Sequence, residues 1–399
     1  MSRLSIASVS MNMPTAKRPE QGIFVRRRLA AMAAHADVRA LHAQPWFPLL
    51  QSFDRSTTDL EFNVTGQPFL YIPFFLKRFD SWWMRRAIRP VLERWHGESS
   101  LDLIDAHFGY PTGVACYHVG RQLGIPTFIT LRGVEASQLR HPAVGRQMVD
   151  ALQGCAGVIA VSHSLKDAAI EAGVDSDRVQ VIPNGVDGRV FCPGDRYDAR
   201  IRLGLPADAP IIVSVGSLIE RKGFHLLLPA FAELRRAYPK SILVIVGGPS
   251  HEISYPQKIS RLIRELNLQQ AVRLPGAVPP DEVATWLQAA DLFCLVSSRE
   301  GCCNAVLEAL ACGVPVVATP VGDNSKYVQA GKTGLVVPLE HMTDLSATLS
   351  MGLAHKWDSS EIVRQTTKYS WSDAANECIT YMHSRLRATR NSLEVSGVL

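Results

Sequence analysis

Short apolar runs alternate with stretches of helical spacing along the first half of the chain. The pattern predicts strands at 4–9, 38–42, 101–106, 126–131, 158–161 and 179–182, with helices at 22–35, 110–123, 144–154 and 162–172. Strands that alternate with amphipathic helices are typical of a parallel sheet with right-handed crossovers. The first half is therefore predicted to be Rossmann-like.

A second series of the same kind follows two stretches rich in Pro, Gly and Asp, 183–187 and 193–210, which together predict an interdomain linker. Its strands are expected at 211–215, 242–246, 272–274, 292–296, 314–318 and 334–337, and its helices at 224–236, 259–266, 281–289, 304–311 and 324–330. We therefore predict an α/β protein whose two Rossmann-like domains, 1–190 and 191–369, have parallel sheets that face each other across a cleft. A last amphipathic helix within 370–399 is expected to return to the first domain.

Two segments of the first half break the alternation. Residues 44–63 are rich in Pro, Phe and Ser, which predicts irregular structure, and residues 69–86 combine aromatic with basic side chains. The aromatic and basic segment suits a bilayer interface, where aromatics enter the surface and cations meet lipid phosphates. A helix packed on the domain with solvated charges explains the same residues, so both interpretations stay open.

Composition adds few constraints. Lys and Arg number 42 and Asp and Glu 37, an excess of 42 − 37 = +5 that suits an anionic ligand or a membrane surface, and no motif for nucleic-acid binding accompanies it. The eight cysteines show no paired C-x-x-C spacing, which favours a reducing cytoplasm without a structural zinc site. No signal peptide or membrane-spanning stretch is predicted.

The stretch 298–315 is predicted to hold the main binding site. It is a strand-to-helix turn with Glu300 in the turn and Glu308 in the second turn of the following helix. Open α/β sheets bind ligands outside the carboxyl ends of their strands. The backbone N–H groups of Gly301, Cys302, Cys303 and Asn304 would point there and suit a phosphate. The pattern predicts a sugar nucleotide, with N–H groups for anionic oxygens and carboxylates for hydroxyls.

The turn after the first strand of the second domain carries two adjacent cations. Gly216 and Gly223 flank Arg221 and Lys222, so a diphosphate could be approached by backbone and neutralised by both side chains. The turn has neither a Walker pattern nor G-x-G-x-x-G, and on its own it could equally be a solvated basic turn. Leu274, at the end of another strand, is a candidate contact for the base or ribose, although such positions are usually only turns.

In the first domain, chemistry is predicted at the carboxyl ends of strands. His107 could orient a sugar or move a proton, and Arg132 could bind the departing diphosphate or an anionic acceptor. The alternatives are a hydrogen-bonded structural role for His107 and, for Arg132 and Glu135, an ion pair with each other or with neighbouring residues. Glu135 and Gly22 are candidates for the acceptor side, where a glycine permits either a tight turn or a close ligand contact.

Four motifs resemble the large bacterial family 4 of retaining glycosyltransferases with the GT-B fold. They are S-R-E-G-x-x-N-x-x-x-E-A-L-A-x-G-x-P-V-V-A-T at 298–319, V-G-S-L-I-E-R-K-G at 215–223, V-S-H-S-L-K at 161–166 and V-I-P-N-G-V-D at 181–187. They span most of the chain in the expected order. The resemblance implies that 191–369 bind a nucleotide-diphosphate sugar and that 1–190 bind the acceptor.

The resemblance also implies residue roles. Arg221 and Lys222 would hold the donor diphosphate, Glu308 the ribose hydroxyls, and Glu300 with the 301–304 backbone the donor sugar. Members of the family need no metal or other cofactor and retain the anomeric configuration. Closure of the cleft would exclude water from the donor.

The chain departs from the family at several positions. Arg132 stands where many members have a histidine, so Arg132 has another role or His107 takes part of it, and Ser217 replaces a frequent arginine. Cys302 and Cys303 replace an apolar residue and a proline; a reactive thiol at a helix start and simple filling of space are the two interpretations.

The motif Thr-Leu-Arg-Gly at 130–133, together with F-V-R-R-R-L at 24–29 and P-W-F-P at 45–48, resembles a subgroup associated with exopolysaccharide or teichuronic-acid assembly. We therefore expect a cytoplasmic enzyme that meets a glycan or lipid-linked acceptor at the inner face of the membrane, with peripheral membrane contact. The alternatives are a sugar-nucleotide epimerase of the same fold and a catalytically silent sugar-nucleotide binding protein.

Overall fold

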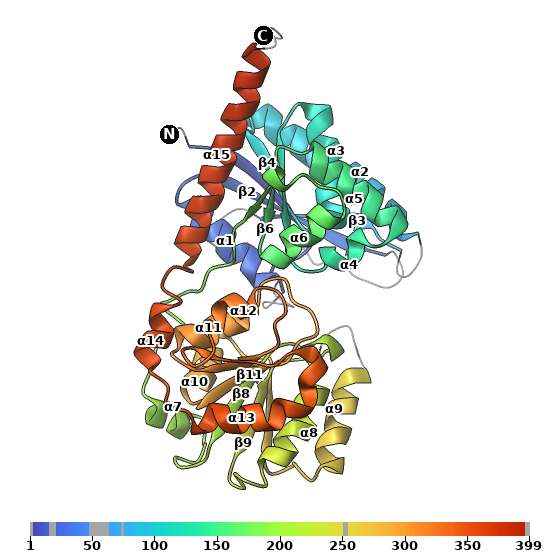
Figure 1. Ribbon diagram of the computed structural model, residues 1–399. Helices are drawn as coiled ribbons and strands as arrows, with labels where there is room; N and C mark the ends of the chain where they lie inside the picture. Colours follow the sequence, from blue (N-terminus) through green and yellow to red (C-terminus); the bar gives the residue numbers. More distant parts are fainter. Residues whose placement is uncertain (1–2, 16–20, 48–63, 73–75, 250–253, 396–399) are drawn as a thin grey trace. The chain divides into compact units, whose positions relative to one another are not determined.

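The computed structural model describes residues 3–15, 21–47, 64–72, 76–249 and 254–395 (Figure 1). The chain forms two compact units. Unit 1 comprises Met1–Gly185 and Trp371–Leu399, and unit 2 comprises Val186–Ser370. The segment 44–63 was expected to be irregular, and most of it, residues 48–63, lies outside the described residues.

Unit 1 contains a seven-stranded parallel sheet in the order β3-β2-β1-β4-β5-β6-β7. Its strands are β1 Ser5–Ser10, β2 Asp37–Trp46, β3 Val64–Leu70, β4 Leu103–His107, β5 Thr127–Leu131, β6 Gly157–Ala160 and β7 Val179–Val181. The central strands β4 and β5 are buried at every position, as expected for strands covered on both faces. Their polar residues Asp105, His107 and Thr130 are therefore buried with the apolar ones.

Helices cover both faces of the unit 1 sheet. They are α1 Ile23–Ala33, α2 Asp80–Glu98, α3 Val114–Leu123, α4 Glu135–Leu139, α5 Pro142–Gly154, α6 His163–Glu171 and α15 Trp371–Val395. Figure 1 shows α15 running beside α1, and the two helices share a buried cluster with β1 and β4. Tyr381 of α15 donates a hydrogen bond to the carbonyl of Arg178 over 2.7 Å, and Arg385 donates one to Ala156 over 2.9 Å. The predicted return of the last helix to the first domain is confirmed.

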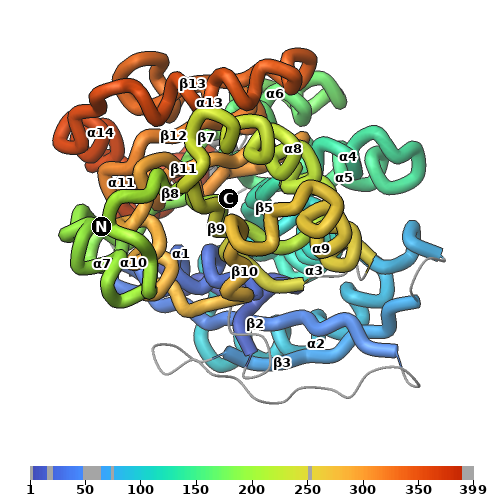
Figure 2. Tube along the Cα trace, turned by 90° about the horizontal axis from the view of Figure 1, so that it is seen from below, coloured from blue at the N-terminus to red at the C-terminus, as the bar shows by residue number. Residues whose placement is uncertain are grey.

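Unit 2 contains a six-stranded parallel sheet in the order β10-β9-β8-β11-β12-β13. Its strands are β8 Ile211–Val215, β9 Ile242–Val246, β10 Val272–Gly276, β11 Leu292–Leu295, β12 Val316–Ala318 and β13 Gly334–Val336. Its helices are α7 Arg196–Arg202, α8 Phe224–Leu234, α9 Ser254–Glu265, α10 Pro280–Gln288, α11 Asn304–Ala311, α12 Asn324–Tyr327, α13 Leu345–Ala354 and α14 Ser359–Arg364. In Figure 2, α8, α9 and α13 lie on one side of the strands and α7, α10, α11 and α14 on the other, which agrees with the two buried clusters of this unit.

Several predicted boundaries need correction. The expected linker at 193–210 contains α7, and Ala199 of α7 is buried in the unit 2 core. Strand β3 was not predicted, because its sequence VTGQPFL has no alternating pattern; as an edge strand it tolerates Pro68. In the aromatic and basic segment, a helix begins at Asp80. Among the described residues, no helix combines the length and apolar character needed to cross a membrane.

Candidate functional site

The loops that follow β8 and β11 bring Arg221, Lys222 and Glu300 together. These strands are neighbours in the unit 2 sheet, and the strand order reverses between them, because β9 lies outside β8 and β12 outside β11. Open parallel sheets bind ligands at such a switch point, outside the carboxyl ends of the strands. Arg221 and Lys222 follow β8, whereas Glu300 follows β11.

The turn after β8 depends on a glycine. Residues Glu220–Lys222 form one 3₁₀ turn that ends at Gly223, whose φ is +74°. A Cβ atom at Gly223 would lie 2.1 Å from the carbonyl oxygen of Val296, which follows β11. The backbone therefore needs glycine for both its conformation and its close approach to the neighbouring loop. The contact fixes the two cations relative to the Glu300 loop.

Three charged side chains meet in this site. Lys222 Nζ lies 2.6 Å from Glu300 Oε1, and Arg221 Nη1 lies 3.0 Å from Glu300 Oε2. Ser297 donates a third hydrogen bond to Glu300 Oε1 over 2.7 Å. Burial alone would raise the pKa of Glu300, but the nearby charges of Lys222 and Arg221 outweigh it and hold the pKa below its usual value. Glu300 is therefore ionised and holds both cations.

The start of α11 fits the prediction in part. The carbonyl of Cys302 accepts the N–H of Asn304 over 3.0 Å, so this N–H is engaged within the turn, contrary to the expectation that it is free for a phosphate. Cys303 is buried, and burial raises the pKa of its thiol. That environment favours the space-filling interpretation over a reactive thiol. Glu308 is half-buried in the second turn of α11, and Gly301 is buried before the helix.

The remaining predicted donor residues lie on other strands. Gly216 directly follows β8, and a Cβ atom there would lie 3.1 Å from Lys222 Cε, so the lysine stem packs on this glycine. Leu274 is 42% exposed on the edge strand β10, which β9 separates from β8. The structure therefore places Gly216 within the charged cluster and Leu274 at the far edge of the sheet.

In unit 1, His107 and Arg132 are hydrogen-bonded to each other. Arg132 donates to His107 Nδ1 from Nη2 over 2.9 Å and from Nε over 3.2 Å, and it donates to Asn184 Oδ1 from Nη1 over 3.0 Å. Arginine has no acceptor, so the ring proton of His107 must be on Nε2, 2.9 Å from Ser8 Oγ. Burial, with the charges of Arg132 and Arg28, holds the pKa of His107 well below its usual value. His107 is therefore a neutral, fully buried side chain that orients Arg132.

A second buried pair lies behind this histidine. Arg28 of α1 donates from Nη1 to Thr130 Oγ1 over 3.0 Å and contacts Asp105 Oδ1 from Nη2 over 3.3 Å. Asp105 is fully buried and also lies 3.3 Å from His107 Nε2. No role for Arg28, Asp105 or Asn184 was predicted from the sequence. Arg28 lies on the same helical face as the apolar residues Val25, Leu29 and Met32. A charged residue at an apolar position of the helix was the sequence feature that could have indicated a buried arginine.

Glu135 does not form the ion pair considered above. Its carboxylate accepts backbone N–H groups from Gly109 over 3.2 Å, Arg132 over 3.0 Å and Gly133 over 2.6 Å. Because its side chain is fully buried, this geometry favours a role in holding the loop after β5 over direct contact with an acceptor. Gly22 has φ +69°, and a Cβ there would lie 2.2 Å from the carbonyl oxygen of Asn12. This geometry favours a tight turn at Gly22 over a close contact with a ligand.

Family models match both halves of the chain. Residues 49–189 match Glycosyltransferase Family 4, and residues 195–368 match Glycosyl transferases group 1. A D-inositol 3-phosphate glycosyltransferase of Corynebacterium urealyticum is 32% identical over 312 residues, 73% of this chain and 73% of that protein. The chain belongs to glycosyltransferase family 4. The family 4 assignment makes it a glycosyltransferase and agrees with the motifs in both units.

Two further relatives of this family 4 glycosyltransferase are named for different acceptors or pathways. A D-inositol 3-phosphate glycosyltransferase of Acidothermus cellulolyticus is 34% identical over 59% of this chain and 56% of that protein. The putative teichuronic acid biosynthesis glycosyltransferase TuaC of Bacillus subtilis is 29% identical over 84% of this chain and 86% of that protein.

Solved structures support the GT-B fold. Sucrose-phosphate synthase of Thermosynechococcus elongatus matches with TM-score 0.76 and 23% identity, covering 97% of this chain and 100% of that chain. Anabaena Alr3699/HepE in complex with UDP-glucose matches with TM-score 0.71 and 20% identity, covering 97% and 99%. The predicted fold class is confirmed.

Proposed function

We propose that this glycosyltransferase moves a sugar from a nucleotide-diphosphate sugar to a glycan or lipid-linked acceptor, with retention of configuration and without a metal. The cluster of Arg221, Lys222 and Glu300 at the switch point of unit 2 carries the proposal. Two cations and one carboxylate leave a formal charge of +1 before a ligand binds. That excess suits a diphosphate, and the cations can neutralise the charge that develops on it as the sugar departs.

The identity of the donor has indirect support. The Anabaena HepE structure contains UDP-glucose in the same fold, so UDP-sugars are the first class to test. The similarity to TuaC, whose name specifies teichuronic acid biosynthesis, supports a role in cell-surface polysaccharide synthesis.

Nucleotide binding tests the donor site directly. UDP is expected to raise the melting temperature of the protein, because a ligand that binds only the folded state stabilises it. Replacing Glu308 by Ala should weaken UDP binding by about 1–3 kcal/mol through lost ribose hydrogen bonds. Calorimetric titration measures this difference. Glu265→Ala is the control, since Glu265 is half exposed on α9 and pairs with Arg261. Equal UDP affinity in both variants would reject the ribose role.

Product analysis separates the proposal from its alternatives. The enzyme is incubated with candidate nucleotide sugars and a membrane extract. A glycosylated product of retained configuration supports transfer, whereas an altered free sugar nucleotide supports epimerisation. Tight nucleotide binding without either product supports a silent binding protein.

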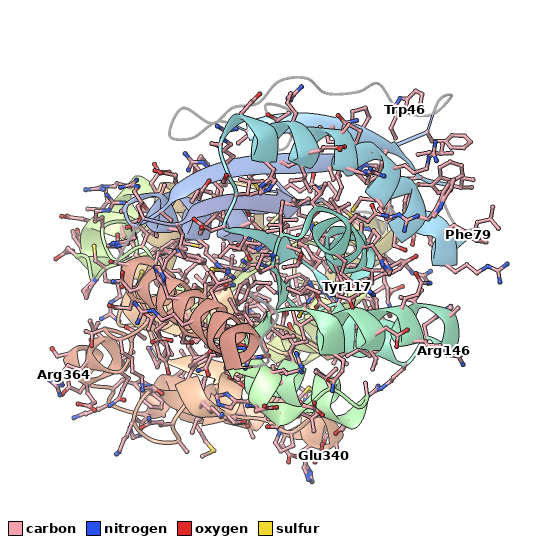
Figure 3. The ribbon with its side chains drawn as sticks, turned by 90° about the horizontal axis from the view of Figure 1, so that it is seen from above. Trp46, Phe79, Tyr117, Arg146, Glu340 and Arg364 are labelled. Atoms are coloured by element: carbon pink, nitrogen blue, oxygen red, sulfur yellow. The ribbon has the colours of Figure 1, made fainter. Side chains whose placement is uncertain are left out.

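An aromatic and basic surface on unit 1 supports peripheral membrane contact. Leu76 and Phe79, just before α2, and Trp82, in its first turn, are 54%, 39% and 40% exposed. Arg78 and Arg86 lie on the same segment, 4.7 Å from the Phe79 ring and 5.1 Å from the Trp82 ring. Figure 3 shows Phe79, Trp46 and Arg146 along one edge of unit 1. Exposed aromatics beside arginines suit an anionic bilayer surface.

Vesicle binding tests this surface. Replacing Arg85 and Arg86 by Gln should lower partitioning onto vesicles with anionic lipid about tenfold or more, since each basic residue near such a surface contributes about 1 kcal/mol. Co-sedimentation measures the partitioning. The control changes Arg261 and Arg264 of α9 to Gln, and unchanged partitioning of the Arg85 and Arg86 variant would reject the membrane contact.

A further inference from the structure

A cavity of about 440 Å³ lies in unit 1 at the corresponding switch point of its sheet. Strand order reverses between β1 and β4, because β2 lies outside β1 and β5 outside β4. Met11 and Asn12 directly follow β1, and Phe108 directly follows β4; all three line the cavity. The cavity therefore occupies the position where open parallel sheets bind ligands, and its volume is that of a small-molecule site.

Aromatic side chains form much of the cavity wall. Tyr71, Phe108 and Tyr110 line it, and Phe108 and Tyr110 are buried. The Tyr110 hydroxyl donates a hydrogen bond to the backbone carbonyl of Lys77, and Gln138 donates from Nε2 to the Tyr110 carbonyl over 3.4 Å. These bonds tie the wall to the segment before α2 and to α4. Such a wall offers a ligand fixed apolar faces rather than a pliable surface.

Opposite charges meet at one end of this wall. Lys77 Nζ lies 3.8 Å from Asp80 Oδ2, is hydrogen-bonded to the Tyr71 hydroxyl and lies 3.7 Å from the centre of the Tyr71 ring. Burial raises the pKa of Asp80 to about 6, and the charge of Lys77 partly opposes that rise. Above this pKa the carboxylate and the ammonium cancel. Apart from this pair and the tyrosines, His141 is the titratable side chain that lines the cavity. Its Nδ1 accepts a hydrogen bond from the N–H of Val144 over 3.4 Å.

This chemistry distinguishes between classes of acceptor. A carboxylate accepts two hydroxyl hydrogens and an ammonium donates to hydroxyl oxygens, so the pair suits neighbouring hydroxyl groups. Aromatic faces suit the apolar faces of a sugar ring. A phosphate would bring a second anionic group beside Asp80, and Lys77 already shares its charge with that carboxylate. The cavity therefore favours an uncharged, polyhydroxylated ring over a phosphorylated one.

We propose that this cavity, the Asp80 cavity, binds an uncharged sugar ring of the acceptor, with Asp80 and Lys77 as its specificity-determining pair. The proposal rests on the proposed function, whose acceptor it assigns to a chemical class. It separates this chain from the relatives named D-inositol 3-phosphate glycosyltransferase, whose name specifies a phosphorylated acceptor.

Direct binding to the full-length protein tests the proposal without turnover. Saturation-transfer NMR is run with a panel of neutral probes, namely glucose, galactose, mannose, N-acetylglucosamine, lactose and cellobiose, and with glucose 6-phosphate and D-inositol 3-phosphate. At least one neutral probe is expected to bind, and more tightly than either phosphorylated probe. Asp80→Asn, which keeps the side-chain shape, and Lys77→Gln should each weaken that binding about tenfold to hundredfold. Asp37→Asn is the control, because Asp37 pairs with Arg3 on the exposed surface of unit 1.

Two results would overturn the proposal. One is tighter binding of a phosphorylated probe that is lost in Lys77→Gln and kept or strengthened in Asp80→Asn, which would make the cavity a phosphate site. The other is that no neutral probe binds the wild type, or that a neutral probe binds wild type, Asp80→Asn and the control equally well. UDP titration of the same variants keeps this test separate from the proposed function. Unchanged UDP affinity with weakened sugar binding in the variants supports the proposed acceptor site. If the wild type does not bind UDP at all, the donor site is rejected instead.

Discussion

Replacing Lys222 by Met is expected to lower kcat/KM for sugar transfer about 100- to 1,000-fold, the range that follows removal of one group that stabilises transition-state charge. Lys222 lies 2.6 Å from Glu300 and packs its stem on Gly216, so its ammonium is held in place before a donor arrives. The loss should appear mainly in kcat, because the charge on the diphosphate grows as the sugar departs. Steady-state kinetics with a UDP-sugar measures it.

A matched lysine controls for the loss of charge. Lys240 is 74% exposed in the same unit and pairs with Asp208 over 2.8 Å, so Lys240→Met should leave the rate unchanged. The melting temperature of both variants checks that they fold. If a folded Lys222→Met enzyme keeps the wild-type rate, the lysine does not act on the diphosphate.

Replacing Asp105 by Ala is expected to destabilise unit 1 by about 3–5 kcal/mol, because it leaves the guanidinium of Arg28 buried without its carboxylate. Both side chains are almost completely buried, at 0% for Asp105 and 3% for Arg28. Hydrogen exchange followed by mass spectrometry measures the loss for each unit separately. Peptides from β4 and β5 should exchange faster, while peptides from β8 and β9 should not change.

A double variant tests the physical reason for this loss. Arg28→Met with Asp105→Ala removes both charges, so it should cost less than Asp105→Ala alone. Asp177→Ala, at an exposed turn of unit 1, should leave exchange unchanged. Equal losses in the single and double variants would mean that the destabilisation comes from lost packing rather than from an unpaired buried cation.

The charged cluster of unit 2 could be predicted closely from the sequence. Adjacent cations after one strand and a glutamate after another are local features, and the rule for parallel sheets brings such loops together. The structure places Arg221 and Lys222 within 3.0 Å of Glu300, as that reasoning requires. Their roles in donor binding stay predictions.

The buried polar groups of unit 1 could not be predicted to the same degree. Its polar groups come from α1, β4, β5 and the loop at Asn184, and no local spacing shows that Arg28 reaches Asp105 or that Arg132 reaches His107. Strand β3 was missed for a related reason. An edge strand is partly covered on each face, so its sequence VTGQPFL needs no apolar alternation.

The position of α15 sets an order of events during synthesis. Ala375, Cys378 and Met382 of this helix belong to the same buried cluster as Ile6 and Val25, whereas unit 2 is one continuous segment, Val186–Ser370. Domains often fold as they leave the ribosome, the N-terminal one first. Unit 1 is the first to be synthesised, but its hydrophobic core cannot be completed until the residues after 370 have been synthesised. Unit 2 can therefore reach its native state earlier, and unit 1 must remain incomplete on the ribosome while unit 2 is translated.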